Sequence, residues 1–229
     1  MAGRLRRRRL TCSVPRMSLK HLLLGMALAV AFAPTVTATP ASADTCSPTK
    51  PPLDAASKQI DRGDMLWVSH TGSVGITTPA GTGVVQVDNA GPLPLRALLI
   101  HADQNAMRQL IVSNGRGAHL YLVSGCDIST VIDSQGAPFL FDLQNLRGNG
   151  TGVGCMDLGA GPHLAGLQAT VGPTGWTVRR TEIDFAGATA TPGRSDTVAA
   201  TSAQDPAVTE AQTISCGDLT ITHDGVQQP

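Results

Sequence analysis

Aromatic residues are scarce in this chain, and no apolar run is long enough to span a bilayer. The 229 residues include four Phe, two Trp and one Tyr, so flat surfaces for stacking against sugars are few. The longest apolar run, residues 22–33, has 12 residues, whereas a membrane-spanning helix needs about 20. These shortages argue against a permanent membrane anchor and against an aromatic binding platform.

The short apolar run fits a secretory signal peptide instead. It is followed by Ala41-Ser42-Ala43, a small-x-small cleavage pattern, so we expect residues 1–43 to be removed. Initiation at Met17 would give a compact signal of ordinary shape; a long basic leader starting at Met1 is the alternative. Neither Cys12 nor Cys46 follows a lipobox, so no lipid anchor is expected.

Basic residues are few once this leader is removed. Residues 1–43 hold 7 of the 17 Lys and Arg residues and no acidic residue, which leaves 10 basic against 17 acidic residues, a net charge of −7. No basic patch remains for nucleic acid or anionic lipid. Abundant Ala, Gly and Thr indicate a high-GC bacterial genome. We therefore expect a secreted, extracytoplasmic protein, most readily of the cell envelope.

Cysteines are also few, and their number is informative. The exported part contains Cys46, Cys126, Cys155 and Cys216. An even number in an exported chain predicts two disulfides, and four cysteines allow three pairings. Since no C-x-x-C pair and no His/Cys group with zinc spacing occurs, metal ligation by these residues is disfavoured.

Helical periodicity is missing beyond residue 60. Short apolar runs alternate there with Gly, Pro, Asn and Asp turns, which predicts an all-β, antiparallel domain over residues 60–229. Residues 44–59 form an extended N-terminal segment, with a short helix over 53–60. Asn114-Gly115 predicts a hairpin turn, and Asp205-Pro206 predicts the start of a second short helix before Cys216.

A weak internal repeat underlies this β pattern. Leu66, Leu110, Leu164 and Leu219 each open a similar segment, and they are spaced by 44, 54 and 55 residues. Each unit would have the size of a propeller blade. The alternative is chance similarity among β sequences.

The stretch before Leu110 resembles the FG-GAP (VCBS-type) repeat, the blade unit of integrin-α-like β-propellers. In that family a D-x-D-x-D-G-x-x-D-L loop binds calcium. The resemblance places His101, Asp103 and Asn105 on the alternating ligand positions and Gln109 on that of the last acid. In the next unit only Asp157 has a ligand-type side chain in register.

The chemistry of these loops predicts that they are vestigial. Calcium takes six to eight oxygen ligands, several of them anionic, and each loop retains one carboxylate. The remaining Asp and Asn side chains are better suited to forming turns with their own backbone. We therefore expect no metal or other cofactor, and at most weak calcium binding.

The resemblance also leads to a disulfide prediction. If consecutive blades pack side by side and the last strand closes the ring, Cys126 pairs with Cys155 and Cys46 with Cys216. Only three repeat lengths fit between Leu66 and Leu219, so an incomplete propeller, a compact sandwich and a fold closed by its own C-terminus all remain open.

Motifs of catalysis are absent from the sequence. It contains no G-x-S-x-G, no HExxH and no paired-carboxylate motif. The glycine-rich residues 148–154 lead into β-type sequence and not into the helix that a phosphate loop needs. Arg62-Gly63-Asp64 matches an integrin-binding tripeptide, but Asp64 is as readily a turn residue.

We expect a non-catalytic binding or structural protein with an envelope protein or glycan as partner. An extracellular hydrolase or carbohydrate-binding domain is the alternative, and a surface adhesin the third hypothesis. The oligomeric state stays open.

Overall fold

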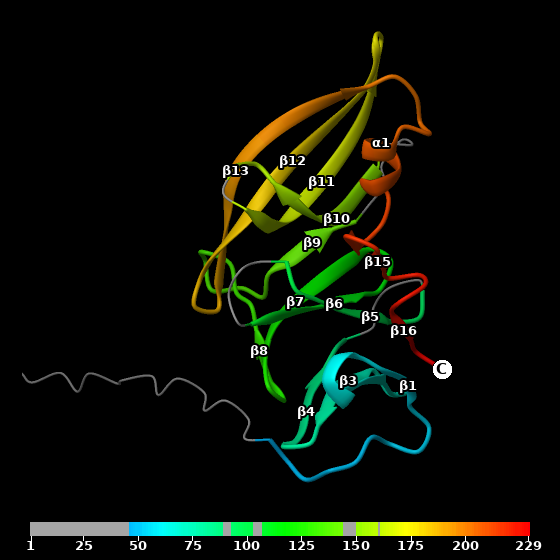
Figure 1. Cartoon of the computed structure of the whole chain (residues 1–229), viewed down its shortest axis with the longest axis vertical. Coiled ribbons are helices and arrows are strands. Elements are labelled where there is room, and N and C mark those ends of the chain that lie inside the picture. Colours follow the sequence, from blue (N-terminus) through cyan, green and yellow to red (C-terminus); the bar gives the residue numbers. More distant parts are fainter. Residues whose placement is uncertain (1–45, 89–92, 103–106, 144–149, 160) are drawn as a thin grey trace, which may run out of the picture. The chain divides into compact units, whose positions relative to one another are not determined.

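Short β-branched and leucine-rich runs, separated by glycine turns, form antiparallel strands in most of the chain. The computed structural model describes residues 46–229 except 89–92, 103–106, 144–149 and 160, and Figure 1 shows its sheets. The predicted signal peptide, residues 1–43, lies outside this range. Within the described residues, no helix has both the length and the apolarity needed to cross a membrane. The all-β prediction is confirmed.

Three antiparallel meanders follow one another along the chain. The first sheet contains β1 (Ala56–Gln59), β2 (Met65–Val68), β3 (Ser73–Thr78) and β4 (Gly81–Gln86), with a 3-10 turn at Asp61–Gly63. The second contains β5 (Arg96–Ile100), β6 (Arg108–Ser113), β7 (Gly117–Ser124) and β8 (Asp127–Thr130). The third contains β10 (Gly150–Asp157), β11 (Pro162–Gly172), β12 (Gly175–Ala186) and β13 (Thr189–Ala200).

Shorter elements complete these sheets. Strand β9 (Leu140–Asp142) pairs with β7, and the C-terminal β16 (Val226–Gln227) pairs with the outer edge of β5. Strands β14 (Ser215–Cys216) and β15 (Leu219–Thr220) form a small hairpin. The only α-helix of the described residues is α1 (Pro206–Glu210).

The second sheet is buried on both faces. In β6, Leu110 and Val112 pack toward the first sheet, whereas Ile111 packs toward the third. Strand β7 repeats this alternation with Leu120 and Tyr121. Because neighbouring side chains of a strand point to opposite faces, an unbroken apolar run marks a strand covered on both sides.

Two sequence predictions of local structure are confirmed, and one is wrong. Asn114 Oδ1 accepts hydrogen bonds from Arg116 N and Gly117 N, both 3.0 Å long, in the β6–β7 turn. Asp205 caps α1 by accepting a hydrogen bond from Ala207 N. The helix predicted over residues 53–60 is absent, because β1 forms there and pairs with β2. The sheets therefore begin at residue 56 and not at 60.

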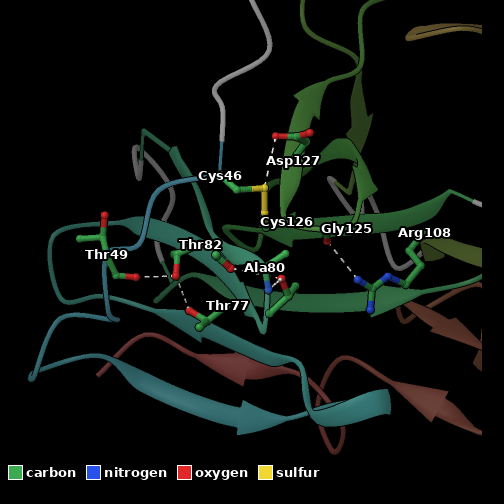
Figure 2. Close-up of a disulfide and its surroundings, with 11 residues drawn as sticks. Cys46, Thr49, Thr77, Ala80, Thr82, Arg108, Gly125, Cys126 and Asp127 are labelled. Atoms are coloured by element: carbon green, nitrogen blue, oxygen red, sulfur yellow. Dashed lines mark hydrogen bonds between the residues drawn. A yellow bond between two sulfur atoms is a disulfide. The ribbon is translucent and has the colours of Figure 1, made fainter.

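Both disulfides form, but their predicted pairing is wrong. Cys46 pairs with Cys126, and Cys155 pairs with Cys216. The β7–β8 turn lies across β4, which brings Cys126 to the N-terminal segment. Figure 2 shows this bridge beside Thr82, whose hydroxyl donates to Thr49 O and bonds the Thr77 hydroxyl at 2.9 Å. The N-terminus is thus fastened to the second sheet and not to the C-terminus.

Candidate functional site

A cleft of about 460 Å³, here called cleft A, lies between the β6–β7 turn, β10 and the C-terminal segment. Its lining combines apolar and neutral polar side chains. The apolar group comprises Leu93, Pro94, Leu143, Ile214 and Ile221; the polar group comprises Ser113, Thr151, Gln212, Thr213, Thr222 and Gln227. Among the described residues that line it, Arg96 is the one with a charge.

Backbone contacts to β10 hold the C-terminal wall of cleft A. Val153 N donates to Thr213 O at 3.0 Å, and the Cys155–Cys216 disulfide ties the same segment to β10. Gly152 permits this approach, because an ideal Cβ at that position would lie 2.4 Å from Thr213 O. The wall is therefore fixed by covalent and backbone bonds.

The charge in cleft A is already engaged. Arg96 Nε and Nη2 donate to Gln227 Oε1 at 3.0 and 2.6 Å, across the β5–β16 pairing. Leu95 N donates to Gln228 Oε1 at 3.0 Å at the same edge. The cleft therefore offers mainly hydroxyl and carboxamide groups above an apolar floor.

A second cleft of about 470 Å³, cleft B, lies on the third sheet beside β9. The strand register places Thr151, Gln168 and Arg179 in one row across β10, β11 and β12. Residues opposite one another in an antiparallel pair share a face of the sheet. Gly166 lies beside this row; the nearest atom to an ideal Cβ there is on the Phe141 ring, 3.7 Å away.

Thr151 lines both clefts. Its hydroxyl oxygen is buried and has no hydrogen-bond partner among the described residues. A buried polar group without a partner costs about 1–3 kcal/mol. The wall between the two clefts thus contains a hydroxyl group that can still form a hydrogen bond.

A third, charged region, cleft C, consists of two adjoining hollows of about 250 and 470 Å³. Both are lined by Asp61, His101 and Arg108. Arg108 Nη1 lies 2.9 Å from Asp64 Oδ2, and Nη2 donates to Gly125 O at 3.3 Å (Figure 2). Asp64 is 8% exposed, so the carboxylate of the Arg62-Gly63-Asp64 tripeptide is occupied within the protein.

Asp224 fastens the C-terminal segment at the margin of cleft C. Its Oδ2 accepts a hydrogen bond from Thr220 N at 2.9 Å, and its Oδ1 lies 3.5 Å from Lys58 Nζ and 3.1 Å from His223 Nδ1. The Thr220 backbone bond is the main cause that lowers the pKa of this carboxyl. His223 and Lys58 lower it further.

Of the vestigial calcium-loop positions, His101 and Asp157 lie at the ends of strands in different sheets. His101 follows β5 in the second sheet, whereas Asp157 ends β10 in the third. Asp157 Oδ1 accepts from Gly159 N and Gly161 N at 2.7 and 3.0 Å, as expected of a turn former. Asp103 and Asn105 lie outside the described residues. The part of the chain that is described contains no group of three metal-ligating side chains.

Gln109, the counterpart of the last calcium-binding acid, is a structural residue. Its side chain is fully buried. Its Oε1 accepts from Ala102 N at 2.8 Å, and its Nε2 donates to Met107 O at 3.2 Å. One carboxamide therefore joins the backbone on both sides of residues 103–106.

Sequence reasoning missed the residues of clefts A and B. Apart from Arg96, Asp142 and Arg179, they are neutral or apolar, and they come from segments far apart in the chain, so no motif connects them. The one available signal is the run of polar residues along β11 and β12, which does not indicate which face is hollow.

The fold and clefts define an all-β protein stapled by two disulfides. Comparison with known proteins adds no relative, because no family model, no curated protein and no solved structure matches the chain.

Proposed function

We propose that this chain is a non-catalytic binding protein of the extracytoplasmic space and that cleft A is its ligand site. The observation that carries the proposal is the lining of cleft A, in which six neutral polar side chains lie among apolar ones. Binding sites combine apolar walls with a few placed polar groups in this way. Two disulfides are compatible with an oxidising compartment outside the cytoplasm.

The lining selects the kind of ligand. Hydroxyl and carboxamide groups match a neutral partner rich in donors and acceptors, and the leucine and isoleucine floor matches aliphatic groups. Among the residues that the structure describes, no aromatic side chain lines cleft A, which makes a glycan the weaker choice. A segment of another envelope protein is therefore the favoured ligand.

Blocking the cleft tests this proposal. Thr222 is exposed and lines cleft A, so Thr222→Trp places an indole in the ligand space. Thr170→Trp, on an exposed position of β11 that does not line cleft A, is the matched control. Native mass spectrometry of the purified protein, a phage-displayed dodecapeptide library and a glycan array serve as probes. We expect a ligand that wild type and the control bind and that Thr222→Trp loses. Equal binding by all three proteins, or none, would overturn the assignment.

We also propose that the chain descends from blade-type repeats related to FG-GAP units. Three antiparallel meanders of four strands support this, since Leu66, Leu110 and Leu164 each lie in the second strand of one meander. A crystal structure tests this by superposition of the three meanders: the leucines are expected at equivalent positions.

A hydrolase is the second candidate function. Asp61 and His101 line cleft C together with Arg108, and carboxylate and imidazole are the usual general acid–base groups. A panel of chromogenic esters, peptides and glycosides tests it, with Asp61→Asn and His101→Ala as variants. Adhesion through the Arg62-Gly63-Asp64 tripeptide is the weakest of the three hypotheses, because Asp64 is buried and paired with Arg108.

A further inference from the structure

We infer that the ligand continues from cleft A past Thr151 into cleft B, and that it is an extended polypeptide segment with an aliphatic side chain toward each end. This inference rests on the proposed function, because it extends the ligand that cleft A would bind. It adds a second subsite and an extended conformation of the bound segment.

The first argument is the unpaired hydroxyl at the junction. Thr151 is the one lining residue common to the two clefts, and its hydroxyl has no partner among the described residues. Rotation about its Cα–Cβ bond exchanges the hydroxyl with the methyl group. A peptide amide passing over the junction would then supply the missing hydrogen bond.

The second argument is the glycine backbone in cleft B. Gly166 lies beside the row formed by Thr151, Gln168 and Arg179, and an ideal Cβ there would only be in ordinary contact with the Phe141 ring. A glycine inside a strand often marks a place where another backbone approaches closely. The carboxamide of Gln168 and the hydroxyl of Thr181, which also lines cleft B, can bond the amides of an extended chain.

The third argument concerns two exposed leucines. Leu93 lines cleft A and is 57% exposed, and Leu140 lines cleft B and is 52% exposed. Leu93 packs against Gly115 in the β6–β7 turn and Leu140 against Gly117 at the start of β7, where ideal Cβ atoms would lie 2.7 and 2.9 Å from the two leucines. A peptide following the clefts would meet one leucine on each side of the turn.

These features distinguish a peptide from a polysaccharide. Aliphatic anchors match aliphatic side chains, which sugars lack, whereas sugar binding relies on exposed aromatic faces. Phe141 is the one aromatic residue among the described residues of either lining, and it is 7% exposed.

The inference is tested with dodecapeptides selected from a phage-displayed library against the oxidised protein. Their affinities are measured by fluorescence anisotropy for wild type, Thr222→Trp in cleft A, and Gly166→Leu in cleft B. The control Thr170→Leu changes an exposed residue of the same strand as Gly166. Circular dichroism verifies folding of each variant, and Arg179→Ala, at an exposed position, is a second cleft-B variant in case Gly166→Leu does not fold.

We expect both cleft variants to weaken binding at least tenfold, Thr151→Val to weaken it severalfold, and the control to leave it unchanged. Binding that Thr222→Trp abolishes but the cleft-B variants leave intact would overturn the second subsite and retain the proposed function. Selection of no peptide, or binding insensitive to Thr222→Trp, would instead remove cleft A as the site. Preference for a glycan over every peptide would overturn the class of ligand.

Discussion

Gly83 allows the β7–β8 turn to lie directly on β4. An ideal Cβ at this position would be 1.7 Å from the carbonyl oxygen of Cys126, so any side chain must displace backbone. We expect Gly83→Ala to lower the free energy of unfolding by about 1–3 kcal/mol, the usual cost of overpacking. Urea denaturation of the oxidised protein measures this. Gly166→Ala is the control, because its Cβ would meet only the Phe141 ring at 3.7 Å; equal losses would contradict the prediction.

Asp224 should make the C-terminal segment sensitive to acid. Its pKa is lowered in the folded protein, chiefly by the Thr220 backbone hydrogen bond. The ionised carboxylate therefore stabilises the fold above its unfolded pKa, near 4, and this contribution is lost as the pH falls through the folded value. We expect the stability difference between wild type and Asp224→Asn to be constant from pH 6 to 8 and to shrink below pH 4. A difference that grows on acidification would be inconsistent with this assignment.

Gln109 explains why calcium should have little effect on stability. Its carboxamide already joins both sides of the loop, whereas a filled calcium site would add about 2.7 kcal/mol at a hundredfold excess over Kd. We expect the melting temperature to be the same within about 1 °C in millimolar calcium and in chelator, since one carboxylate per loop is too few. A rise of several degrees with calcium, reversed by chelator, would show a functional site.

Single residues were predictable where their effect is local. Asn114 and Asp205 bond backbone groups two or three residues away, and Asp157 does the same. The sequence alone aligns Gln109 with a calcium ligand. Its actual role, a buried hydrogen bond to Ala102, depends on how β5 and β6 pair and is therefore not visible in the local sequence. The position of Thr151 between clefts A and B depends on residues from distant segments, so the sequence around Thr151 does not predict it.

At the scale of elements, the two disulfides should have separable effects. Each closes a loop, of 80 residues for Cys46–Cys126 and 61 for Cys155–Cys216, and chain entropy assigns about 4 kcal/mol to either. We expect the double variant Cys155→Ser/Cys216→Ser to lose stability. It should also lose ligand binding in cleft A, because this disulfide holds the wall of the cleft. Cys46→Ser with Cys126→Ser, the matched control, should lose similar stability but keep binding. Loss of binding in both double variants, with both folded, would argue against this role.

Elements were less predictable than turns. Residues 53–60 contain good helix formers, but residues 56–59 pair with β2, and tertiary pairing overrides such propensities. The disulfide pairing was wrong for a related reason. Cys126 reaches Cys46 because the β7–β8 turn crosses β4 at Gly83, a contact between meanders that no spacing of cysteines encodes.

The whole molecule should unfold as one unit, because the second sheet shares a core with each of the others. Trp67 lies in the first sheet and Trp176 in the third, so each tryptophan reports on one side. We expect the fluorescence of Trp67, recorded in a Trp176→Phe variant, and far-UV circular dichroism to give coincident urea transitions. If the third sheet unfolded separately, the fluorescence and circular dichroism transitions would not coincide, and the prediction would be wrong.

At this scale the sequence predicted the class of fold but not the clefts. Alternating apolar runs and glycine turns report burial strand by strand, so the all-β architecture follows from them. Cleft A arises where Leu93, Thr151 and residues 212–227 meet, and cleft B where β9 meets the third sheet. Side chains from such distant segments carry no spacing signal.

The order of the disulfides bears on how the chain acquires its covalent form. Cys46 pairs with the next cysteine along the chain, and Cys155 with the one after it, so the two loops neither interleave nor nest. If the chain is exported N-terminus first, as its proposed extracytoplasmic location implies, Cys46 and Cys126 emerge before Cys155. Oxidation of the thiols in the order of their emergence would then give the native linkages without reshuffling.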